Sequence, residues 1–225
     1  MKCLTIFVLF VAIFYAQTSS FDHKHTWEYP VLKTLPCLVL SALVHFGMSP
    51  LKGQEASYHA KGLFLGAVGD LLLALSENGL YPGAVAFAIG HIYYMAVIAP
   101  KIIQIHINLA LVAFVYAAGI NYAFLVPALT ASPLSTLIMM AYSIILTTGV
   151  VLAGSLYLQD ERIGKSATKS SDLLLFAGFA LFMISDSLLL LCYLGRPIPY
   201  SNQIVLFTYF GAQYAILCGA SRQLV

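Results

Sequence analysis

Charged residues are scarce in this sequence. Asp, Glu, Lys and Arg make up only 9% of its 225 residues, whereas soluble domains carry about 25%. Hydrophobic residues make up 60%, the mean hydropathy is +0.89, and no stretch is long and polar enough to form a separate soluble domain. The composition therefore excludes an ordinary soluble protein. It predicts a single all-α membrane domain over residues 1–225.

Two further shortages narrow the possible functions. The net charge is only +2 and the basic residues are scattered, which excludes the basic patch of a nucleic-acid-binding protein. Only four cysteines occur, and no two of them form the Cys-x-x-Cys pair found in many zinc and redox sites. We interpret Cys3, Cys37, Cys192 and Cys218 as small hydrophobic residues.

Apolar runs of helical length fill the chain. A membrane-crossing helix needs roughly 20 mostly apolar residues. Seven such runs are clear, and the shorter run 4–16 fits either a first helix or the apolar part of a signal peptide. We favour a helix there, which gives eight predicted membrane-crossing helices, at about 4–17, 31–48, 58–76, 82–99, 102–121, 134–157, 172–194 and 203–221.

The basic residues predict the orientation of these helices. Cytoplasmic loops of membrane proteins carry an excess of Lys and Arg. With eight helices, the side that holds the N-terminus carries Lys2, Lys52, Lys61, Lys101, Arg162, Lys165, Lys169 and Arg222. The opposite side carries only Lys24, Lys33 and Arg196. Both termini are therefore predicted to be cytosolic.

Two acidic residues interrupt the apolar runs. Asp70 lies within "AVGDLLLAL" and Asp186 within "MISDSLLLL". At 1.5 Å per residue they lie roughly 18 Å and roughly 21 Å along helices that run in the same direction, so they can share a depth. An intramembrane acid is expensive and is a functional candidate by default. The alternative is a structural role, with each carboxyl protonated or paired with Lys33 or His91.

A weak internal repeat surrounds the two acids. "GDLLLAL", a Pro-containing turn and "AIGHIYYM" parallel "SDSLLLL", a Pro-containing turn and "LFTYFGAQ". His91 falls in the first unit, whereas Tyr209 and Gln213, one helical turn apart, fall in the second. Related repeats often place their polar residues at a central site. The pattern predicts two four-helix repeats around a central polar cleft, with Asp70, Asp186 and His91 in one cavity.

Taken together, these motifs resemble the multi-pass YhhN-like family, whose characterised members are lysoplasmalogenases. The similarity rests on "LKTLP" at 32–36, "AVGD" at 67–70, "HIYY" at 91–94, "SDSLLLL" at 185–191 and "PYSNQIVLFTYFGAQ" at 199–213. The order and spacing of these motifs match from about residue 31 to the end. The family residues fall on Lys33, Gly69, Asp70, His91, Tyr94, Ser185, Asp186, Tyr209 and Gln213.

The resemblance implies an enzyme that hydrolyses the vinyl ether of a lysoplasmalogen to a fatty aldehyde and glycerophosphocholine or glycerophosphoethanolamine. Protonation of the alkene gives an oxocarbenium-like cation, which needs an acid, a nearby anion and a base for water, as in glycosidases. Asp70 and Asp186 supply the acid and the anion in an order that the sequence leaves open, and His91 is a base or proton relay.

The same resemblance implies supporting residues and a location. Lys33, Tyr94, Ser185, Tyr209 and Gln213 are expected to bind or orient the substrate. The expected partners are a lysophospholipid, water and the bilayer, with no metal or cofactor, in the endoplasmic reticulum membrane. The oligomeric state is left open.

Two other functions stay open at this stage. Buried acids and internal repeats also occur in proton-coupled transporters, and a family member can lack activity. A presenilin-like protease is disfavoured, because its Gly-x-Gly-Asp motif is replaced by Ala67-Val68-Gly69-Asp70 and the second aspartate follows this motif instead of preceding it.

The predicted orientation is testable by cysteine labelling. Single cysteines in place of Lys52, Lys101 and Lys165 should react with an impermeant maleimide from the cytosolic side of sealed membranes. A cysteine in place of Arg196 should react from the opposite side. Labelling of the first three positions from the lumenal side contradicts the orientation.

Overall fold

The computed structural model describes residues 2–22, 27–76, 78–163, 166–196 and 198–221, with the side chains of residues 2, 160–163 and 166–167 left aside. Within these residues the chain forms α-helices and short 3₁₀ or π turns, and no strand. The α-helices are α1 (Lys2–Gln17), α2 (Tyr29–His45), α3 (Gly53–Leu75), α4 (Leu80–Ile98), α5 (Ile107–Ile120), α6 (Pro133–Ile163), α7 (Ser166–Tyr193) and α8 (Ser201–Ala220). The short turns are η1 (Ala99–Lys101), the π-helical η2 (Asn121–Leu125) and η3 (Val126–Ala128).

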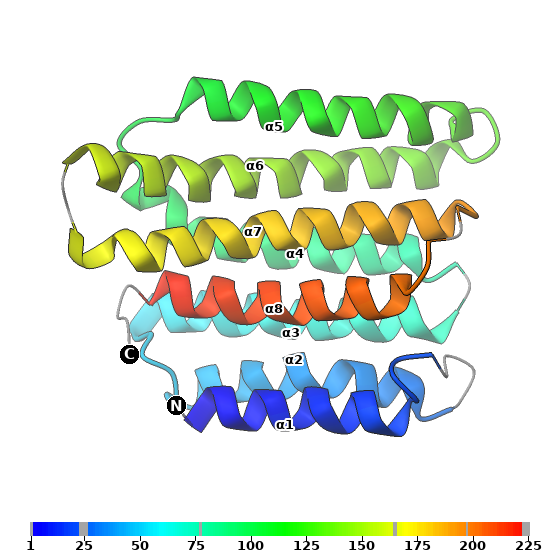
Figure 1. Ribbon diagram of the computed structural model, residues 1–225, viewed down its shortest axis with the longest axis horizontal. Helices are drawn as coiled ribbons and strands as arrows, with labels where there is room; N and C mark the ends of the chain where they lie inside the picture. The colour runs from blue at the N-terminus through cyan, green and yellow to red at the C-terminus, as the bar shows by residue number, and fades with distance from the viewer. Residues whose placement is uncertain (1, 23–26, 77, 164–165, 197, 222–225) are drawn as a thin grey trace.

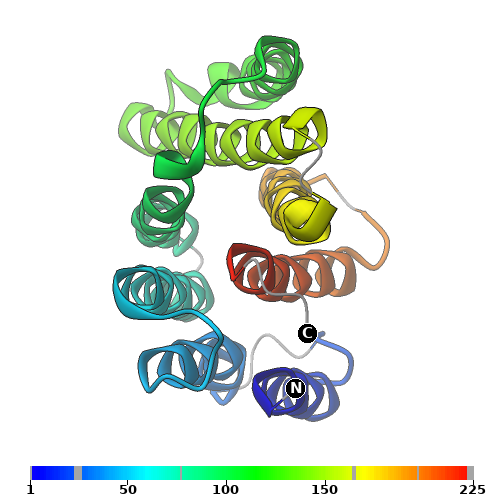
Figure 2. The same cartoon turned by 90° about the vertical axis from the view of Figure 1, so that its left-hand side faces the viewer.

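The helices form two layers closed along one edge. Consecutive helices run in opposite directions, so the start of α1 and the end of α8 lie at the same end of the molecule (Figure 1). Seen along the helices, α2, α3 and α4 form one layer, and α1, α8 and α7 form the other (Figure 2). Helix α6 contacts both α4 and α7 and so joins the layers, and α5 packs on the outside of α6.

Glycines bring the backbones together within each layer. A Cβ on Gly90 of α4 would lie 3.0 Å from the carbonyl oxygen of Gly62 in α3. In the other layer, a Cβ on Gly219 of α8 would lie 2.4 Å from the backbone nitrogen of Leu175 in α7. Small residues commonly allow such close approach between membrane helices.

Aromatic side chains fill the space between the layers. The Phe182 ring of α7 lies 4.4 Å from the His91 ring of α4 and 6.0 Å from the Phe87 ring, measured between centroids. The Phe87 ring also lies 5.8 Å from that of Tyr209 in α8. These contacts hold the two layers at a fixed separation around the polar residues described below.

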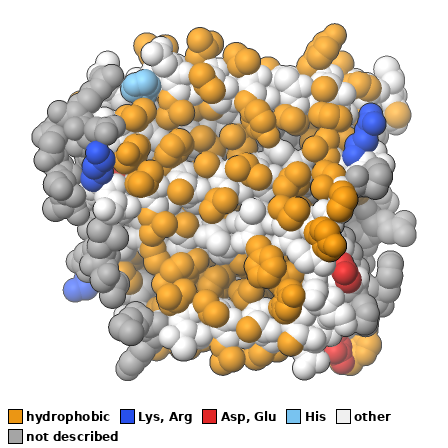
Figure 3. Space-filling model, in the orientation of Figure 1, with side chains coloured by type: hydrophobic (Ala, Val, Ile, Leu, Met, Phe, Trp, Pro, Cys, Tyr) orange, Lys and Arg blue, Asp and Glu red, His pale blue; other side chains and the backbone are white. Residues whose placement is uncertain are grey.

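The protein is a multi-pass integral membrane protein. Six helical segments are long and apolar enough to cross a membrane, at Gly53–Leu75, Leu80–Lys101, Ile107–Ala128, Pro133–Gln159, Thr168–Tyr193 and Ser201–Ala220. Hydrophobic side chains cover the middle of the face in Figure 3, whereas the charged ones lie toward its two ends. Helices α1 and α2 are apolar but shorter, so a total of eight crossings stays a prediction.

Several helix boundaries differ from the prediction. Helix α3 begins at Gly53 instead of 58, α7 begins at Ser166 instead of 172, and α6 continues to Ile163. Hydropathy marks only the apolar part of a helix. Polar residues can extend the helix beyond that part, and hydropathy does not detect this extension. Helix α5 begins late, at Ile107, because the side chain of His106 caps its first turn by accepting a hydrogen bond from the Leu109 amide.

The basic residues are only partly described. Lys52, Lys61, Lys101 and Lys169 lie toward the end of the molecule that holds both termini, whereas Arg196 lies at the opposite end. Lys33 differs from all of these because its ammonium is buried. The side chains of Lys2, Lys24, Arg162, Lys165 and Arg222 lie outside the described residues. Cytosolic termini stay a prediction, as does the pair of four-helix repeats.

The close packing of α7 and α8 gives a matched pair of substitutions. Gly219→Ala places a methyl against the α7 backbone and should lower the free energy of unfolding by about 1–3 kcal/mol. Gly211→Ala, on the same helix, meets nothing within 4 Å and should be neutral or stabilise by up to about 1 kcal/mol. Thermal unfolding of the two variants in detergent measures the difference. Equal melting temperatures would contradict the close packing.

Candidate active site

A row of glycines on α3 makes room for the buried polar residues. Gly62, Gly66 and Gly69 precede Asp70 at spacings that place them along one side of the helix. A Cβ at these glycines would lie 2.3 Å from the Tyr94 ring, 2.8 Å from Gln213 Nε2 and 2.9 Å from the Phe87 ring, respectively. The missing side chains of α3 are thus replaced by side chains from α4 and α8.

Asp70 is the centre of a buried charged network. Its side chain is almost fully buried, and its Oδ1 lies 3.5 Å from the Lys33 ammonium of α2. The Tyr209 hydroxyl of α8 donates a hydrogen bond of 2.6 Å to Asp70 Oδ2. A cation and a hydroxyl donor thus both contact this carboxylate, so its negative charge is compensated inside the protein.

A chain of hydrogen bonds extends this network to α4. Tyr94 Oη donates to Gln213 Oε1 at 2.7 Å, and Gln213 Nε2 donates to Tyr209 Oη at 3.2 Å. Cys37 Sγ lies 3.4 Å from the same Tyr209 oxygen. Every donor from Tyr94 to Tyr209 is directed toward Asp70, which favours a negative charge on that carboxylate. Cys37 is fully buried in the hydrophobic core, as expected of a small hydrophobic residue, and its thiol adds one weak polar contact to this network.

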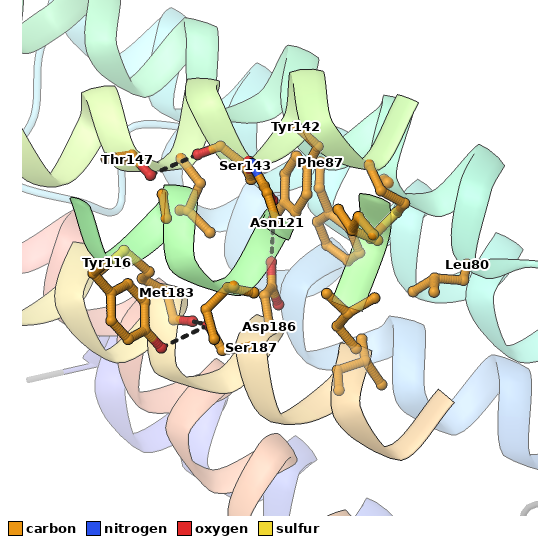
Figure 4. Close-up of a pocket in the computed structure, with 18 of the residues that line it drawn as sticks. Leu80, Phe87, Tyr116, Asn121, Tyr142, Ser143, Thr147, Met183, Asp186 and Ser187 are labelled. Carbon is orange, nitrogen blue, oxygen red and sulfur yellow. Dashed lines mark hydrogen bonds between the residues drawn. The ribbon is translucent and has the colours of Figure 1, made fainter. Parts of the chain in front are cut away.

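Asp186 has a different environment. It lies on α7 and lines a small pocket, which we call the inner pocket and which is formed by residues of α3, α4, α5, η2, α6 and α7. Most lining side chains are apolar. The Tyr142 hydroxyl of α6 donates to Asp186 Oδ2. Figure 4 shows Asp186 reaching from α7 toward Tyr142, with Asn121 and Ser143 on the same side of the pocket.

His91 packs near one tyrosine of each of these two environments, Tyr94 and Tyr142. Its Nδ1 is 2.9 Å from the carbonyl oxygen of Phe87, and because a carbonyl can only accept, Nδ1 carries the hydrogen. Nε2 therefore has the lone pair of the neutral ring, and it is buried without a hydrogen-bond partner among the described residues. The ring centroid lies 5.9 Å from that of Tyr94 and 6.1 Å from that of Tyr142.

The structure brings most of the predicted residues together, but in two groups. Lys33, Asp70, Tyr94, Tyr209 and Gln213 form one network. Asp186 bonds to Tyr142 instead, and the inner pocket is lined by neither Asp70 nor His91. The single cavity expected for both carboxylates and His91 is therefore divided.

Ser185 does not face this pocket. Its hydroxyl is buried and donates to the carbonyl oxygen of Val205 at 2.9 Å, which links α7 to α8. A serine that directly precedes Asp186 in a helix points about 100° away from it. The direct role of Ser185 here is therefore a helix–helix contact.

The residues that separate the Asp70 network from the inner pocket were not identified from the sequence. Phe87 and Phe182 separate the Asp70 network from the inner pocket, and an aromatic residue in an apolar helix gives no signal of such a role. Tyr142 interrupts the apolar run "LIMMAYSIIL" with a hydroxyl, a signal that could have found it. Asn121 of η2 links to α6, because its Nδ2 donates to Ser143 Oγ at 2.8 Å.

A second pocket adjoins the inner pocket. We call it the mouth; it lies at the end of the molecule opposite the two termini and is lined by residues including Trp27, Tyr29, Lys33, Ser76 and Asn202. Leu73 and Leu189 line both pockets. No group of three or more His, Cys, Asp or Glu side chains in the described part of the chain is arranged to hold a metal ion.

Fold and site together define a multi-pass membrane protein with buried acidic residues beside an apolar pocket. The family model described as YhhN family matches residues 29–220, so the chain belongs to the YhhN family. Two relatives are named lysoplasmalogenase TMEM86A, one from Bos taurus with 28% identity and one from Homo sapiens with 26% identity. Each match covers 201 residues, 87% of this chain and 79% of the relative. No solved structure matches the chain.

The buried ion pair predicts a large asymmetry between two lysines. Lys33→Met leaves the Asp70 carboxylate without its cation and should lower the free energy of unfolding by about 3–5 kcal/mol. Lys101→Met breaks a pair with Glu55 at the surface, which should cost under about 1 kcal/mol. Thermal unfolding in detergent measures both.

A double variant tests the cause of this asymmetry. Lys33→Met combined with Asp70→Asn removes both charges and should recover most of the stability lost by Lys33→Met alone, because no buried charge is left unpaired. A double variant no more stable than Lys33→Met would show that the lysine acts by packing and not by charge.

Proposed function

We propose that the protein is a lysoplasmalogenase, an ether hydrolase that cleaves the vinyl ether bond of an alkenyl-glycerophosphocholine or alkenyl-glycerophosphoethanolamine. The names of its relatives support this activity. The observation that carries the proposal is the position of Asp186, whose carboxyl lies in an apolar pocket and has a hydroxyl partner in Tyr142. The proposal places the protein in the endoplasmic reticulum membrane with cytosolic termini.

The inner pocket suits the hydrocarbon part of this substrate. Most of its lining side chains are apolar, and it reaches α5 and η2 on the outer side of the bundle. A fatty chain in such a pocket stays in an apolar environment, as it does in the bilayer, so the hydrophobic effect does not oppose its transfer. The vinyl ether at the head of the chain then lies beside Asp186.

Asp186 is the proposed general acid. No described cation contacts its carboxyl, and the pocket walls are apolar, so a neutral acid is cheaper to bury here than a carboxylate. Tyr142 donates to Oδ2, which leaves Oδ1 to carry the proton. Protonation of the alkene carbon by Asp186 then gives an oxocarbenium ion and leaves a carboxylate on Asp186.

Asp70 is the proposed permanent anion. Lys33 and Tyr209 hold it as a carboxylate. A fixed negative charge near a developing cation lowers the energy of the transition state. This assignment resolves the order that the sequence left open, with Asp186 as acid and Asp70 as electrostatic stabiliser.

The remaining steps require a base and a second proton transfer. Water adds to the cationic carbon. Because His91 does not line the inner pocket, the proton of the added water is proposed to pass through a second water to the lone pair of His91 Nε2, which has no hydrogen-bond partner among the described residues. The hemiacetal then collapses: its hydroxyl proton passes to the Asp186 carboxylate, the carbon–oxygen bond to glycerol breaks, and the glycerol oxygen takes the proton from His91. The products are a fatty aldehyde and a glycerophosphodiester, and each group returns to its starting protonation state.

The two acids can be tested by aldehyde release from purified protein. Asp186→Asn and Asp70→Asn should each lower the rate by about 10²–10⁴-fold, the usual scale for one acid–base group. Glu55→Gln, a carboxylate at the surface paired with Lys101, should leave the rate within about twofold because it does not contact the site. Melting temperatures are measured alongside, so that loss of folding is not read as loss of chemistry.

The substrate supplies its own control. A lysophospholipid with a saturated 1-O-alkyl chain cannot form the cation by protonation and should yield no aldehyde. A folded wild-type protein that releases no aldehyde from a lysoplasmalogen would overturn the proposed function. The test would then turn to lipid-coupled proton uptake in vesicles, which distinguishes a proton-coupled transporter from an inactive family member.

A further inference from the structure

The mouth contains charged and aromatic groups in a definite order. Lys33 lies at its inner side, where its ammonium also contacts Asp70. Trp27 lies at its outer side and is 82% exposed. Asp22 lies beside the rim, because Asn202 in the mouth lining donates to its carboxylate at 3.2 Å and Gln203 donates at 3.2 Å as well. A positive group is therefore inside, and an aromatic and a negative group are outside.

Leu73 and Leu189 define where the mouth meets the inner pocket. Both side chains line both pockets, so a molecule that occupies the two pockets together passes between them. The path runs from Trp27 at the rim, past Lys33 and between the two leucines, to Asp186 in the apolar interior. Polarity falls along this path, as it does along a lysophospholipid from head group to chain.

We infer that the mouth is a binding site for the zwitterionic head group of a lysophospholipid, with Lys33 contacting the phosphate and Trp27 the quaternary ammonium. The inference rests on the proposed function and adds the site that holds the polar part of the substrate. A lipid that enters chain first presents its phosphate to Lys33 before its ammonium reaches the rim. The order of charges in the mouth matches this order.

Each contact has a distinct physical basis. The Lys33 ammonium has three hydrogens, so it can donate to a phosphate oxygen while it stays beside Asp70. Trp27 offers an exposed indole face, the aromatic surface that best attracts a quaternary ammonium. Asp22 adds a negative charge near the same rim, which Asn202 and Gln203 hold in place.

Trp27 is the one tryptophan of the sequence, so its fluorescence reports on binding in the mouth even when no substrate is cleaved. The probe is a saturated 1-O-alkyl-glycerophosphocholine, which cannot be cleaved, added to purified protein in detergent. We expect a saturable change in Trp27 emission. A 1-O-alkylglycerol with the same chain and no head group should give none. An equal response to both lipids would overturn the inference, because Trp27 would then sense lipid in the micelle.

Two variants test whether the change in tryptophan emission comes from lipid bound in the mouth. In Trp27→Phe combined with Phe46→Trp, the tryptophan moves to a position of similar exposure, beyond the other end of α2, and should not respond to the probe. In Lys33→Met combined with Asp70→Asn, which keeps no unpaired buried charge, the apparent affinity should fall roughly tenfold or more, because a charged hydrogen bond to phosphate is lost. Unchanged affinity in this variant would contradict the role of Lys33.

Kinetics separate this inference from the proposed function. Trp27→Ala should raise KM for an alkenyl-glycerophosphocholine by roughly two- to fivefold, the scale of an exposed cation–π contact, with kcat unchanged. A head-group-dependent Trp27 signal without aldehyde release would support the mouth as a head-group site and overturn the proposed chemistry. The opposite result is aldehyde release, an unchanged KM in Trp27→Ala and no head-group-dependent signal. It would overturn the head-group site in the mouth and leave the proposed function intact.

Discussion

The Lys33 ammonium and the Asp70 carboxylate lie 3.5 Å apart in the interior of the bundle, where neither charge tolerates the loss of the other. Their contact fixes α2 against α3. Tyr209 adds α8 by bonding to the same carboxylate, and Gln213 and Tyr94 extend the connection to α4. One buried charge pair thus sets the relative positions of four helices. The surrounding contacts are apolar and have no preferred direction, so they do not orient the polar side chains. The hydrogen bonds and the ion pair of this network orient them.

The aromatic wall gives the two acids different environments. Phe87 and Phe182 pack between the Asp70 network and the inner pocket. Both carboxyl groups accept a hydrogen bond from a tyrosine, but only Asp70 has a cation beside it, and Asp186 lines a mostly apolar pocket. Acid–base chemistry with two carboxyl groups requires this inequality, since groups in identical environments would have the same protonation state. His91 touches both sides through Tyr94 and Tyr142, which suits a group that passes protons between them.

The sequence predicted the helices and most of the polar residues, and it failed on their arrangement. Hydropathy located all eight helices, because each contains an apolar run, but misplaced the ends of α3 and α7, where polar residues continue the helix. The structural alternative for Asp70 named Lys33 as one possible partner, and the two side chains do form an ion pair. Helical depth says nothing of rotation about the helix axis, and so it could not show that Asp186 bonds to Tyr142, that Ser185 turns to α8, or that Phe87 divides the cavity.

The glycine row of α3 has a consequence for how this chain can change over evolution. Gly62, Gly66 and Gly69 each occupy the place where a methyl would strike Tyr94, Gln213 or Phe87. Replacement by alanine, normally the mildest substitution in a helix, would here displace a residue of the network or of the aromatic wall. A larger residue on α3 becomes acceptable only with a smaller one opposite. We therefore expect each glycine to covary with the residue it faces, Gly62 with Tyr94, Gly66 with Gln213 and Gly69 with Phe87, among descendants of this sequence. The summed volume of the two side chains should be conserved, whereas the residue types can change.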